Sequence, residues 1–351
     1  MFKPNFTLNS KIVNQLALVE RYYGQLIARQ TIPSFALRLM QENRVLSTHY
    51  STSIEGNPLT PQEVTNVVLD DQIPINKSEV EVKNYFDLLI YISTMAQKKV
   101  MINIDFMLSL HKKLMQNIEI KRPGLLRNND VIVGHRGPEG LVAKHNPPVH
   151  RAIEIRKYLN DVFGWINTQK ELHPLIQVAI LHHEIAYIHP FYDGNGRIAR
   201  ILTAYFLLLK KYEVTKYFIL DDYYDVDRLL YSDKLHSADK GNKTEWIAYF
   251  LEGIAYSLKA ALSRIEKISD ATLERVKGEK RALVTRREED VLQMIITKKQ
   301  IKTSDVVKAF DVSRQQAQSL LSSLVDKRLL KKHGKTKSSY YTLRKRVEQQ
   351  I

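Results

Sequence analysis

The chain has 351 residues, of which 44% are hydrophobic and 26% charged, ordinary values for a soluble globular protein of two or three domains. There is no cysteine, which excludes a disulfide framework and any zinc site built on thiolates. The formal net charge is +15, and residues 281–351 hold 17 Lys and Arg against 7 Asp and Glu. Such a basic segment predicts an anionic partner, and nucleic acid is the first candidate. The alternative is a solvated surface, which has the same composition.

The first residues, MFKPNFTLNSKIV, lack the apolar run of a signal peptide, and no stretch approaches the roughly 20 apolar residues that cross a bilayer. We therefore expect a cytoplasmic protein without membrane contact. Apolar residues return every three or four positions along most of the chain, which predicts helices. The clearest are at 11–28, 80–96, 105–115, 153–167, 174–187 and 244–268.

Strand signals are few. Residues 130–148, DVIVGHRGPEGLVAKHNPP, place two short apolar runs around a Gly/Pro-rich turn and predict a β-hairpin among the helices. The helical pattern weakens at 269–284, which predicts a linker. Beyond it, helices at 287–296, 304–310 and 313–327 and two short strands around a Lys/Gly turn predict a winged-helix domain at 285–345.

Residues 189–200 read HPFYDGNGRIAR and lie between two predicted helices. Gly194 and Gly196 permit positive φ and have no Cβ, so successive backbone N–H groups can turn toward one bound group. The following helix begins here, and its positive end favours an anion. The loop therefore predicts a phosphate cradle.

The charged residues of this loop favour a di- or triphosphate. Arg197 and Arg200, three positions apart, can reach the same side of the helix and bind phosphate oxygens. Asp193 would repel the ligand unless a cation such as Mg²⁺ lay between them. Asn195 can brace the loop or donate to a phosphate, and His189 is suited to removing a proton from a hydroxyl. These parts predict phosphoryl or nucleotidyl transfer.

HPFYDGNGRIAR resembles the signature of the Fic family, His-x-Phe-x-Asp/Glu-Gly-Asn-Gly-Arg-x-x-Arg, at every fixed position, and the similarity extends over roughly residues 40–265. The resemblance implies a helical core with a β-hairpin flap and transfer of AMP from ATP to a Ser, Thr or Tyr hydroxyl of a target protein or of the chain itself. It implies that His189 is the general base, Asp193 the Mg²⁺ ligand and Phe191 a core anchor. The phosphates would be bound by Gly194, Asn195, Gly196, Arg197 and Arg200. A related branch that phosphorylates has Lys in place of Gly196, which argues against that activity.

Residues 51–57, STSIEGN, could be a polar loop or a helix end. They also resemble the inhibitory motif of many Fic proteins, Ser/Thr-x-x-x-Glu-Gly/Asn, with Ser51, Glu55 and Gly56 in the required places. Glu55 would then pair with Arg200 and deprive the γ-phosphate of its partner. In some relatives the same glutamate supports removal of AMP, so the reverse reaction is an alternative function.

The resemblance also extends to the flap and the nucleotide site. An exposed edge of the hairpin at 130–148 could bind a target segment as an added strand, although an ordinary surface hairpin reads the same way. Relatives line the nucleotide site with the start of the flap and place an aromatic and an Asn around adenine. The corresponding residues here are Val131, Ile132, Val133, Gly134, Tyr231 and Asp239. At position 239 this sequence departs from the relatives, with Asp in place of Asn.

HHEIAYIH, residues 182–189, is not a zinc-protease helix, because His-Glu-x-x-His would need His where Tyr187 stands. His182 and His183 are therefore expected to be ordinary helix residues.

In the basic segment Ser313 can cap a helix whose outer face offers Arg314, Gln315 and Gln318, residue types that read base edges in DNA. Winged helices also serve as protein-docking or dimer modules, so binding of DNA, of protein and formation of a homodimer stay open.

The expected fold class is mainly α: a Fic-type helical core with a β-hairpin flap and a C-terminal winged helix-turn-helix domain. We expect an N-terminal helical region with the inhibitory motif at 1–100, the catalytic core at 101–268, the linker at 269–284 and the winged helix at 285–345. The two function classes are an autoinhibited AMP-transferring enzyme and a DNA-binding regulator with a secondary core.

Overall fold

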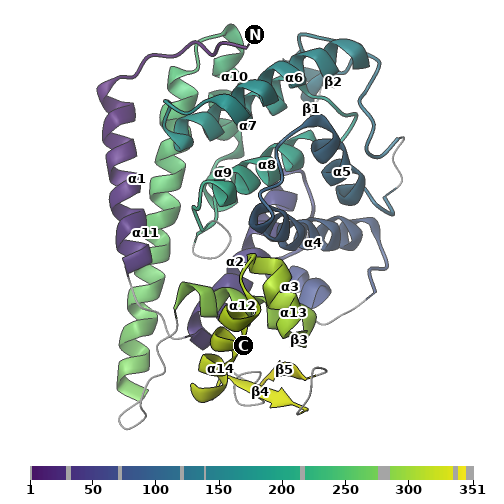
Figure 1. The fold of residues 1–351 in the computed structure, drawn as a ribbon. Coiled ribbons are helices and arrows are strands. Elements are labelled where there is room, and N and C mark those ends of the chain that lie inside the picture. Colours follow the sequence, from purple (N-terminus) through teal and green to yellow (C-terminus); the bar gives the residue numbers. More distant parts are fainter. Residues whose placement is uncertain are drawn as a thin grey trace. The chain divides into compact units, whose positions relative to one another are not determined.

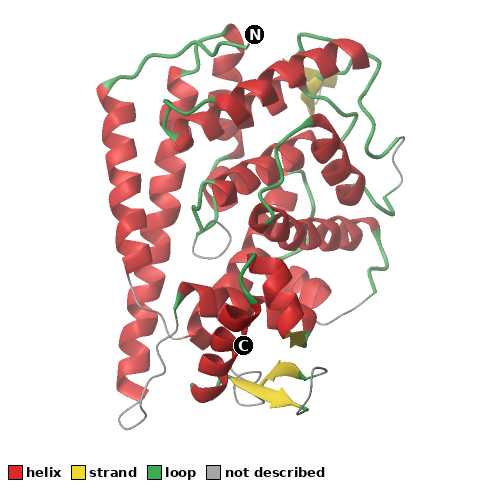
Figure 2. Ribbon diagram, viewed as in Figure 1, coloured by secondary structure: helices red, strands yellow, loops and turns green. Residues whose placement is uncertain are grey.

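The computed structural model describes residues 2–28, 33–69, 73–118, 122–137, 140–213, 218–275, 285–334 and 339–344. Helices dominate these residues, and the strands form one hairpin and one small sheet (Figure 2). The predicted mainly helical fold class with a β-hairpin is therefore confirmed. Among the described helices, none has the length and apolar character needed to cross a membrane.

The chain divides into two compact units. Unit 1 comprises Met1–Gly24 and Arg44–Ala261, and unit 2 comprises Gln25–Asn43 and Leu262–Ile351. Of the predicted linker, residues 269–275 continue a helix, whereas 276–284 lie outside the described residues.

Most helices of Figure 1 belong to unit 1, and three of them, α1, α2 and α11, run on into unit 2. The helices and strands that lie wholly or partly in unit 1 are, in chain order, α1 (Ser10–Ala28), α2 (Pro33–Ile54), α3 (Pro61–Leu69), α4 (Lys77–Gln97), α5 (Ile104–Leu114), β1 (Val133–Gly137), β2 (Gly140–His145), α6 (Ala152–Thr168), α7 (Pro174–Ile188), α8 (Asn195–Leu209), α9 (Asp221–Val226), α10 (Arg228–Ser237), the 3₁₀ turn η1 (Ala238–Lys240) and α11 (Thr244–Arg275).

The centre of unit 1 is the helix pair α7 and α8, which pack side by side (Figure 1). α7 begins with Pro174 at its first turn and is buried along nearly all of its length, as its run of Ile, Leu, Val and Ala predicts. α8 is buried through Leu207 and packs against α4 and α5 as well. The short loop between α7 and α8 is therefore fixed at both ends by core packing.

The predicted hairpin is present as β1 and β2, which pair antiparallel with a register shift between Val133 and Gly134. Its turn, residues 138–139, lies outside the described residues. Lys144 on β2 lies 3.4 Å from Asp233 and 3.5 Å from Ser232, both on α10. The second strand is thereby attached to the helix that precedes η1.

Unit 2 contains the last residues of α1 and α11, the first part of α2 from Pro33, and a C-terminal group of elements. These are α12 (Arg286–Lys298), β3 (Ile301–Lys302), α13 (Thr303–Phe310), α14 (Arg314–Asp326), β4 (Leu330–His333) and β5 (Tyr340–Leu343), with the strands in the order β3-β5-β4. The three helices and two of the strands lie where the sequence predicted them. The assignment as a winged helix stays an interpretation of this element order.

Hydrogen-bonded caps start α12 and α14. Thr285 and Glu288 bond to each other's backbone N–H at the start of α12, and Ser313 and Gln316 do the same at α14. Leu321 and Leu324 of α14 and Tyr341 of β5 belong to one buried apolar cluster. Unit 2 thus has its own hydrophobic core.

Candidate active site at the start of α8

The loop at 189–194 joins α7 to α8. His189 ends α7 with a left-handed backbone (φ +48°), and the fully buried Arg127 holds this end. Its guanidinium donates to the carbonyl oxygens of His189 (2.6 Å), Ile188 (3.1 Å) and Val149. Because the last carbonyls of a helix lack partners within it, a cation here satisfies them and suits the negative end of the helix dipole. Arg127 is a positioning residue for His189.

We expect Arg127→Met to destabilise unit 1, because it leaves several buried carbonyl oxygens unsatisfied. Methionine keeps most of the side-chain volume, so loss of these hydrogen bonds is the main change. Each such loss costs about 1–3 kcal/mol, so the free energy of unfolding should fall by about 3 kcal/mol or more. Urea denaturation followed by circular dichroism measures this. Arg156→Met, at an exposed position of α6, is the control and should change the free energy by less than about 0.5 kcal/mol. Equal denaturation midpoints for the two variants would contradict the role of Arg127.

Side-chain contacts fix the inside of the loop. The Asn195 amide accepts from the Phe191 N–H (2.8 Å) and donates to the Phe191 carbonyl oxygen (2.9 Å). The buried Phe191 ring stacks on His111, with ring centroids 3.6 Å apart. The Gly124 N–H donates to His111 Nδ1 (2.8 Å), so His111 Nε2 carries the hydrogen and donates to the Asp193 carbonyl oxygen (3.0 Å). Burial lowers the pKa of His111 to about 4, which keeps this neutral form at pH 7.

The two glycines of the motif serve different purposes. Gly194 has φ +78°, a left-handed conformation, and a Cβ there would press on the side chains of Met115 and Leu114. A Cβ on Gly196 would overlap the carboxylate of Glu55. The bare backbone at Gly196 therefore lets a carboxylate, itself an anion, lie against the first turn of α8.

Arg197 and Arg200 are buried on α8, each with a side chain only 3% exposed. Arg197 Nη2 donates to Asp193 Oδ1 (3.2 Å), and its Nη1 lies 3.4 Å from Glu81 Oε1. Within the described part of the chain, Arg197 Nε and Nη1 are buried without a hydrogen-bond acceptor. A buried cation with two unsatisfied donors is suited to an anionic ligand with several oxygen atoms.

Arg200 is held by the residues just before and after the end of α2. Its Nη2 donates to Glu55 Oε1 (2.8 Å) and to the Ser51 carbonyl oxygen (2.8 Å), and its Nε donates to Ser51 Oγ (2.7 Å). Gly56 follows with φ +90°, which ends α2 and turns the chain away. Sequence reasoning predicted this group of Ser51, Glu55, Gly56 and Arg200, and the structure brings Ser51, Glu55 and Arg200 into contact.

The Glu55 carboxyl is ionised at neutral pH. Burial alone would raise its pKa, but the charges of Arg200 and Arg197 outweigh burial and lower the pKa below that of an ordinary glutamate. The side chain is 32% exposed, so the ion pair lies at the edge of the solvent rather than sealed inside. A ligand that replaced Glu55 on Arg200 would release the carboxylate toward water.

A second carboxylate, Asp221 of α9, lies 3.6 Å from Arg200 Nε and accepts from Ser47 Oγ (2.6 Å). Burial raises the pKa of Asp221 to about 6, although Arg200 opposes the shift. Sequence reasoning missed Asp221, Glu81, His111 and Arg127. Arg127 lies in the segment RPGLLRNNDVIVG that resembles the approach to the flap, but none of the four stands in a motif that reveals its contact.

The His189 imidazole is a neutral base at pH 7. Burial lowers its pKa to about 4, although the Ala186 carbonyl oxygen, 3.4 Å from Nδ1, opposes the shift. With the hydrogen on Nδ1 toward that carbonyl oxygen, Nε2 keeps a free lone pair. The ring is only partly buried, so a substrate hydroxyl can reach it.

The residues predicted to surround adenine lie in different environments. Tyr231 is buried, stacks on Tyr224 with centroids 4.4 Å apart and shares a hydrogen bond with His182 Nε2 (2.8 Å). Asp239 bonds to three histidines, His145, His183 and His236. Of the flap residues Val131, Ile132, Val133 and Gly134, the first and third are half-buried and the other two exposed. Their contact with a nucleotide stays a prediction.

The remaining predicted residues lie elsewhere. His182 is fully buried and its Nδ1 pairs with Thr203 Oγ1 (2.9 Å), as expected of a packed helix residue. Arg314, Gln315 and Gln318 are exposed on α14 of unit 2. Their side chains are therefore available to a partner of that unit.

Comparison with known proteins agrees with the geometry of the loop. Residues 101–207 match the model of the Fic/DOC family. The chain is 30% identical over 160 residues to the protein adenylyltransferase Fic of Drosophila erecta, an alignment that covers 44% of the chain and 30% of that protein. It is 24% identical over 243 residues to the protein adenylyltransferase fic-1 of Caenorhabditis elegans, covering 67% of the chain and 44% of that protein. The chain thus spans less than half the length of these curated relatives.

Two solved structures share the fold. A Fic family protein from Desulfovibrio desulfuricans is 22% identical, with a TM-score of 0.61, and the alignment covers 98% of the chain and 99% of that protein. Fic-1 residues 134–508 from C. elegans are also 22% identical, with a TM-score of 0.60 and 73% of each chain covered. At this identity the likeness is one of fold.

Proposed function

We propose that the chain, whose residues 101–207 match the model of the Fic/DOC family, is a protein adenylyltransferase that moves AMP from ATP to a Ser, Thr or Tyr hydroxyl of a target protein or of itself. The curated relatives bear the name protein adenylyltransferase, which makes them nucleotidyltransferases. The target protein would dock on the hairpin at 130–148.

One observation carries the proposal. The Glu55 carboxylate lies 2.8 Å from Arg200 against the bare backbone of Gly196, at the start of α8. An anion therefore already fits the place where the motif predicts a phosphate, and Arg197 retains two buried donors beside it. A triphosphate that displaced Glu55 would meet Arg200 and these donors together.

Magnesium fits the donor set as well. Asp193 Oδ1 accepts from the Gly194 N–H (2.6 Å) and from Arg197, which orients the carboxylate, and the side chain is 42% exposed. A carboxylate in this setting can hold Mg²⁺ together with phosphate oxygens and water. Bound Mg²⁺ would neutralise charge on the phosphates.

The chain's own residues would perform the transfer as follows. His189 Nε2 removes the proton of the target hydroxyl, and that oxygen forms a bond to the α-phosphorus. The bond from the α-phosphorus to the bridging oxygen of the β-phosphate breaks, and pyrophosphate leaves. The α8 N-terminus, Arg197 and Arg200 stabilise the negative charge on the phosphates and hold them in place.

Two labelled forms of ATP test the reaction class. The purified Glu55→Gly variant with Mg²⁺ should incorporate label into itself from ATP marked at the α-phosphate and none from ATP marked at the γ-phosphate. The variant is then added to a lysate of its host with the α-labelled form. The bands also identify the targets. Incorporation from the γ-labelled form would show phosphoryl transfer instead and overturn the proposal.

Glu55 would act as an inhibitor, because its carboxylate holds the guanidinium that the γ-phosphate needs. Ser51 supports this state through its two hydrogen bonds to Arg200.

For unit 2, binding of duplex DNA stays a prediction that the exposed Arg314, Gln315 and Gln318 support. Retention on duplex DNA that weakens steeply with salt is the expected sign, and no retention at low salt would contradict it.

A further inference from the structure

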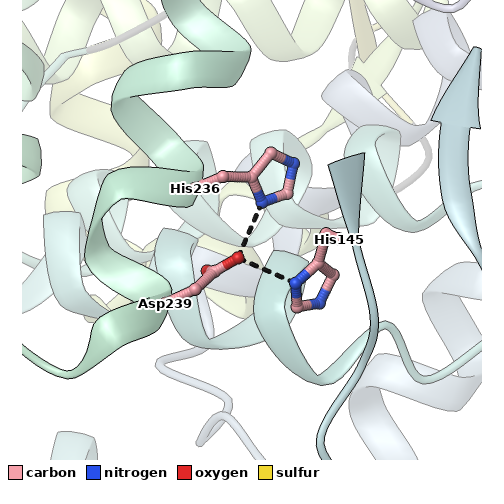
Figure 3. Close-up of side chains that lie close together, drawn as sticks. All are labelled: His145, His236 and Asp239. Atoms are coloured by element: carbon pink, nitrogen blue, oxygen red, sulfur yellow. Dashed lines mark hydrogen bonds and ion pairs between the residues drawn. The ribbon is translucent and has the colours of Figure 1, made fainter. Parts of the chain in front are cut away.

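Three side chains from separate elements of unit 1 converge on one point (Figure 3). His145 ends β2, His236 lies on α10 and Asp239 lies in η1. The Nδ1 atoms of both histidines approach the same carboxylate oxygen, Asp239 Oδ2, at 2.7 Å and 3.0 Å. The three potential ligand atoms all lie within 4.8 Å of one another. The group shares no residue with the loop at 189–194.

The hydrogen bonds of His145 leave one contact unexplained. Its Nε2 lies 2.7 Å from the Tyr187 carbonyl oxygen, which can only accept, so Nε2 carries a hydrogen. Its Nδ1 lies 2.7 Å from the Asp239 carboxylate, which also accepts. A neutral imidazole has a single N–H, so the second contact needs either a protonated ring or a metal ion between Nδ1 and the carboxylate.

The surrounding contacts orient the three groups as metal ligands are commonly oriented. A ligating histidine usually donates its other N–H to a carbonyl oxygen, as His145 does to Tyr187. Lys243 donates to His183 Nδ1 (2.9 Å), so His183 Nε2 carries a hydrogen and donates to Asp239 Oδ1 (3.0 Å). This leaves Oδ2 to face the two histidines.

From this geometry we propose that His145, His236 and Asp239 form a binding site for a divalent transition-metal ion of the zinc class. Two imidazole nitrogens and one carboxylate oxygen suit Zn²⁺, with a water in the fourth position, whereas Mg²⁺ and Ca²⁺ prefer oxygen ligands alone. The side chains of His236 and Asp239 are 17% and 18% exposed, so an ion can enter. Ligand atoms of tetrahedral Zn²⁺ lie about 3.3 Å apart, so the two His–Asp distances, 2.7 Å and 3.0 Å, need to lengthen by only about half an ångström. The two histidine nitrogens lie within 4.8 Å of each other, so they need to approach by at most about 1.5 Å.

The site would attach the flap to α10 and η1. His145 is the last residue of β2, and its neighbour Lys144 already pairs with Asp233 of α10. Bound Zn²⁺ would add a second attachment between β2 and α10–η1. We therefore expect Zn²⁺ to slow amide hydrogen exchange at residues 141–145.

Equilibrium dialysis of the full chain, stripped of metal, free of affinity tag and without nucleotide, tests the site. We expect one Zn²⁺ per chain and, with Co²⁺ as the probe, visible absorption bands of tetrahedral coordination. His236→Ala and Asp239→Asn should each weaken Zn²⁺ binding about a hundredfold, since loss of an outer-shell partner alone costs 10- to 100-fold. Far-UV circular dichroism checks that each variant is folded. Asp239→Asn keeps the shape of the side chain and removes its charge.

Two control variants locate the ion. His150→Ala removes an exposed histidine that pairs with Asp130 on the surface, and Asp193→Ala removes the proposed Mg²⁺ ligand. Both should bind Zn²⁺ as the unaltered chain does. Absence of Zn²⁺ binding at about 10 µM, or equal binding by folded His236→Ala and Asp239→Asn, would overturn the proposal and leave a protonated His145 as the explanation of the contact.

Discussion

Replacing Glu55 by Gly is expected to raise AMP transfer about 10- to 100-fold. The carboxylate holds Arg200 Nη2 at 2.8 Å, and a charge-assisted hydrogen bond is worth about 1.5–3 kcal/mol, which corresponds to this range of rates. Glu55 follows the last residue of α2, so glycine at this position interrupts no helix. Incorporation of α-labelled AMP into the chain itself, at subsaturating ATP, measures the gain.

Two further variants separate charge from volume. Glu55→Gln keeps the volume against Gly196 but removes the charge, and we expect a gain between those of the wild type and Glu55→Gly. Glu171→Gly removes an exposed glutamate between α6 and α7 and should leave the rate unchanged. Equal incorporation by the wild type and Glu55→Gly would remove the inhibitory interpretation. Release of AMP from a modified target by the wild type, lost in Glu55→Gly, would favour the reverse reaction.

Replacing His189 by Ala in the Glu55→Gly background is expected to lower transfer by about 10²–10⁴-fold, the usual contribution of a general base. Binding of ATP should change little, because the anion-binding residues lie on α8 and not on the imidazole. Single-turnover incorporation of label measures the chemical step, and His150→Ala in the same background is the control. A loss smaller than about tenfold would show that His189 is not the base.

The pH dependence of AMP transfer follows from the His189 imidazole. Burial lowers the pKa of His189 to about 4, and the charge of Glu55 raises it, so its removal should lower the pKa further. A base acts in its neutral form, above its pKa. The single-turnover rate of Glu55→Gly should therefore not fall between pH 8 and pH 6 through His189. Titration of the His189 ring near pH 6.5, followed by NMR of the labelled imidazole, would contradict the burial of this residue.

The motif at the start of α8 could be predicted because its parts are close in sequence. His189, Asp193, Gly194, Gly196, Arg197 and Arg200 share one loop and the first two turns of α8, so the local course of the chain alone brings them together. Their supports come from distant segments: Arg127 precedes the flap, His111 lies on α5 and Asp221 on α9. A single sequence contains no signal for such long-range pairs.

The same distinction applies to the fold. The strongly amphipathic or apolar helices, such as α1, α5 and α7, were predicted within a few residues. α2 was not, because polar residues such as Thr48 and Thr52 are buried along it and break the apolar period. Each hydroxyl donates to a carbonyl oxygen one turn earlier, at 2.8 Å, so burial leaves it satisfied. The convergence of His145, His236 and Asp239 was equally beyond the sequence pattern.

Calorimetric titration of the Glu55→Gly variant with ATP and Mg²⁺ tests most directly whether the turn after His189 binds a triphosphate. We expect one ATP per chain, bound more tightly than by the wild type, and a loss of at least tenfold in affinity when Arg200→Ala is added. Absence of binding by Glu55→Gly, or binding that Arg200→Ala leaves unchanged, would contradict the account.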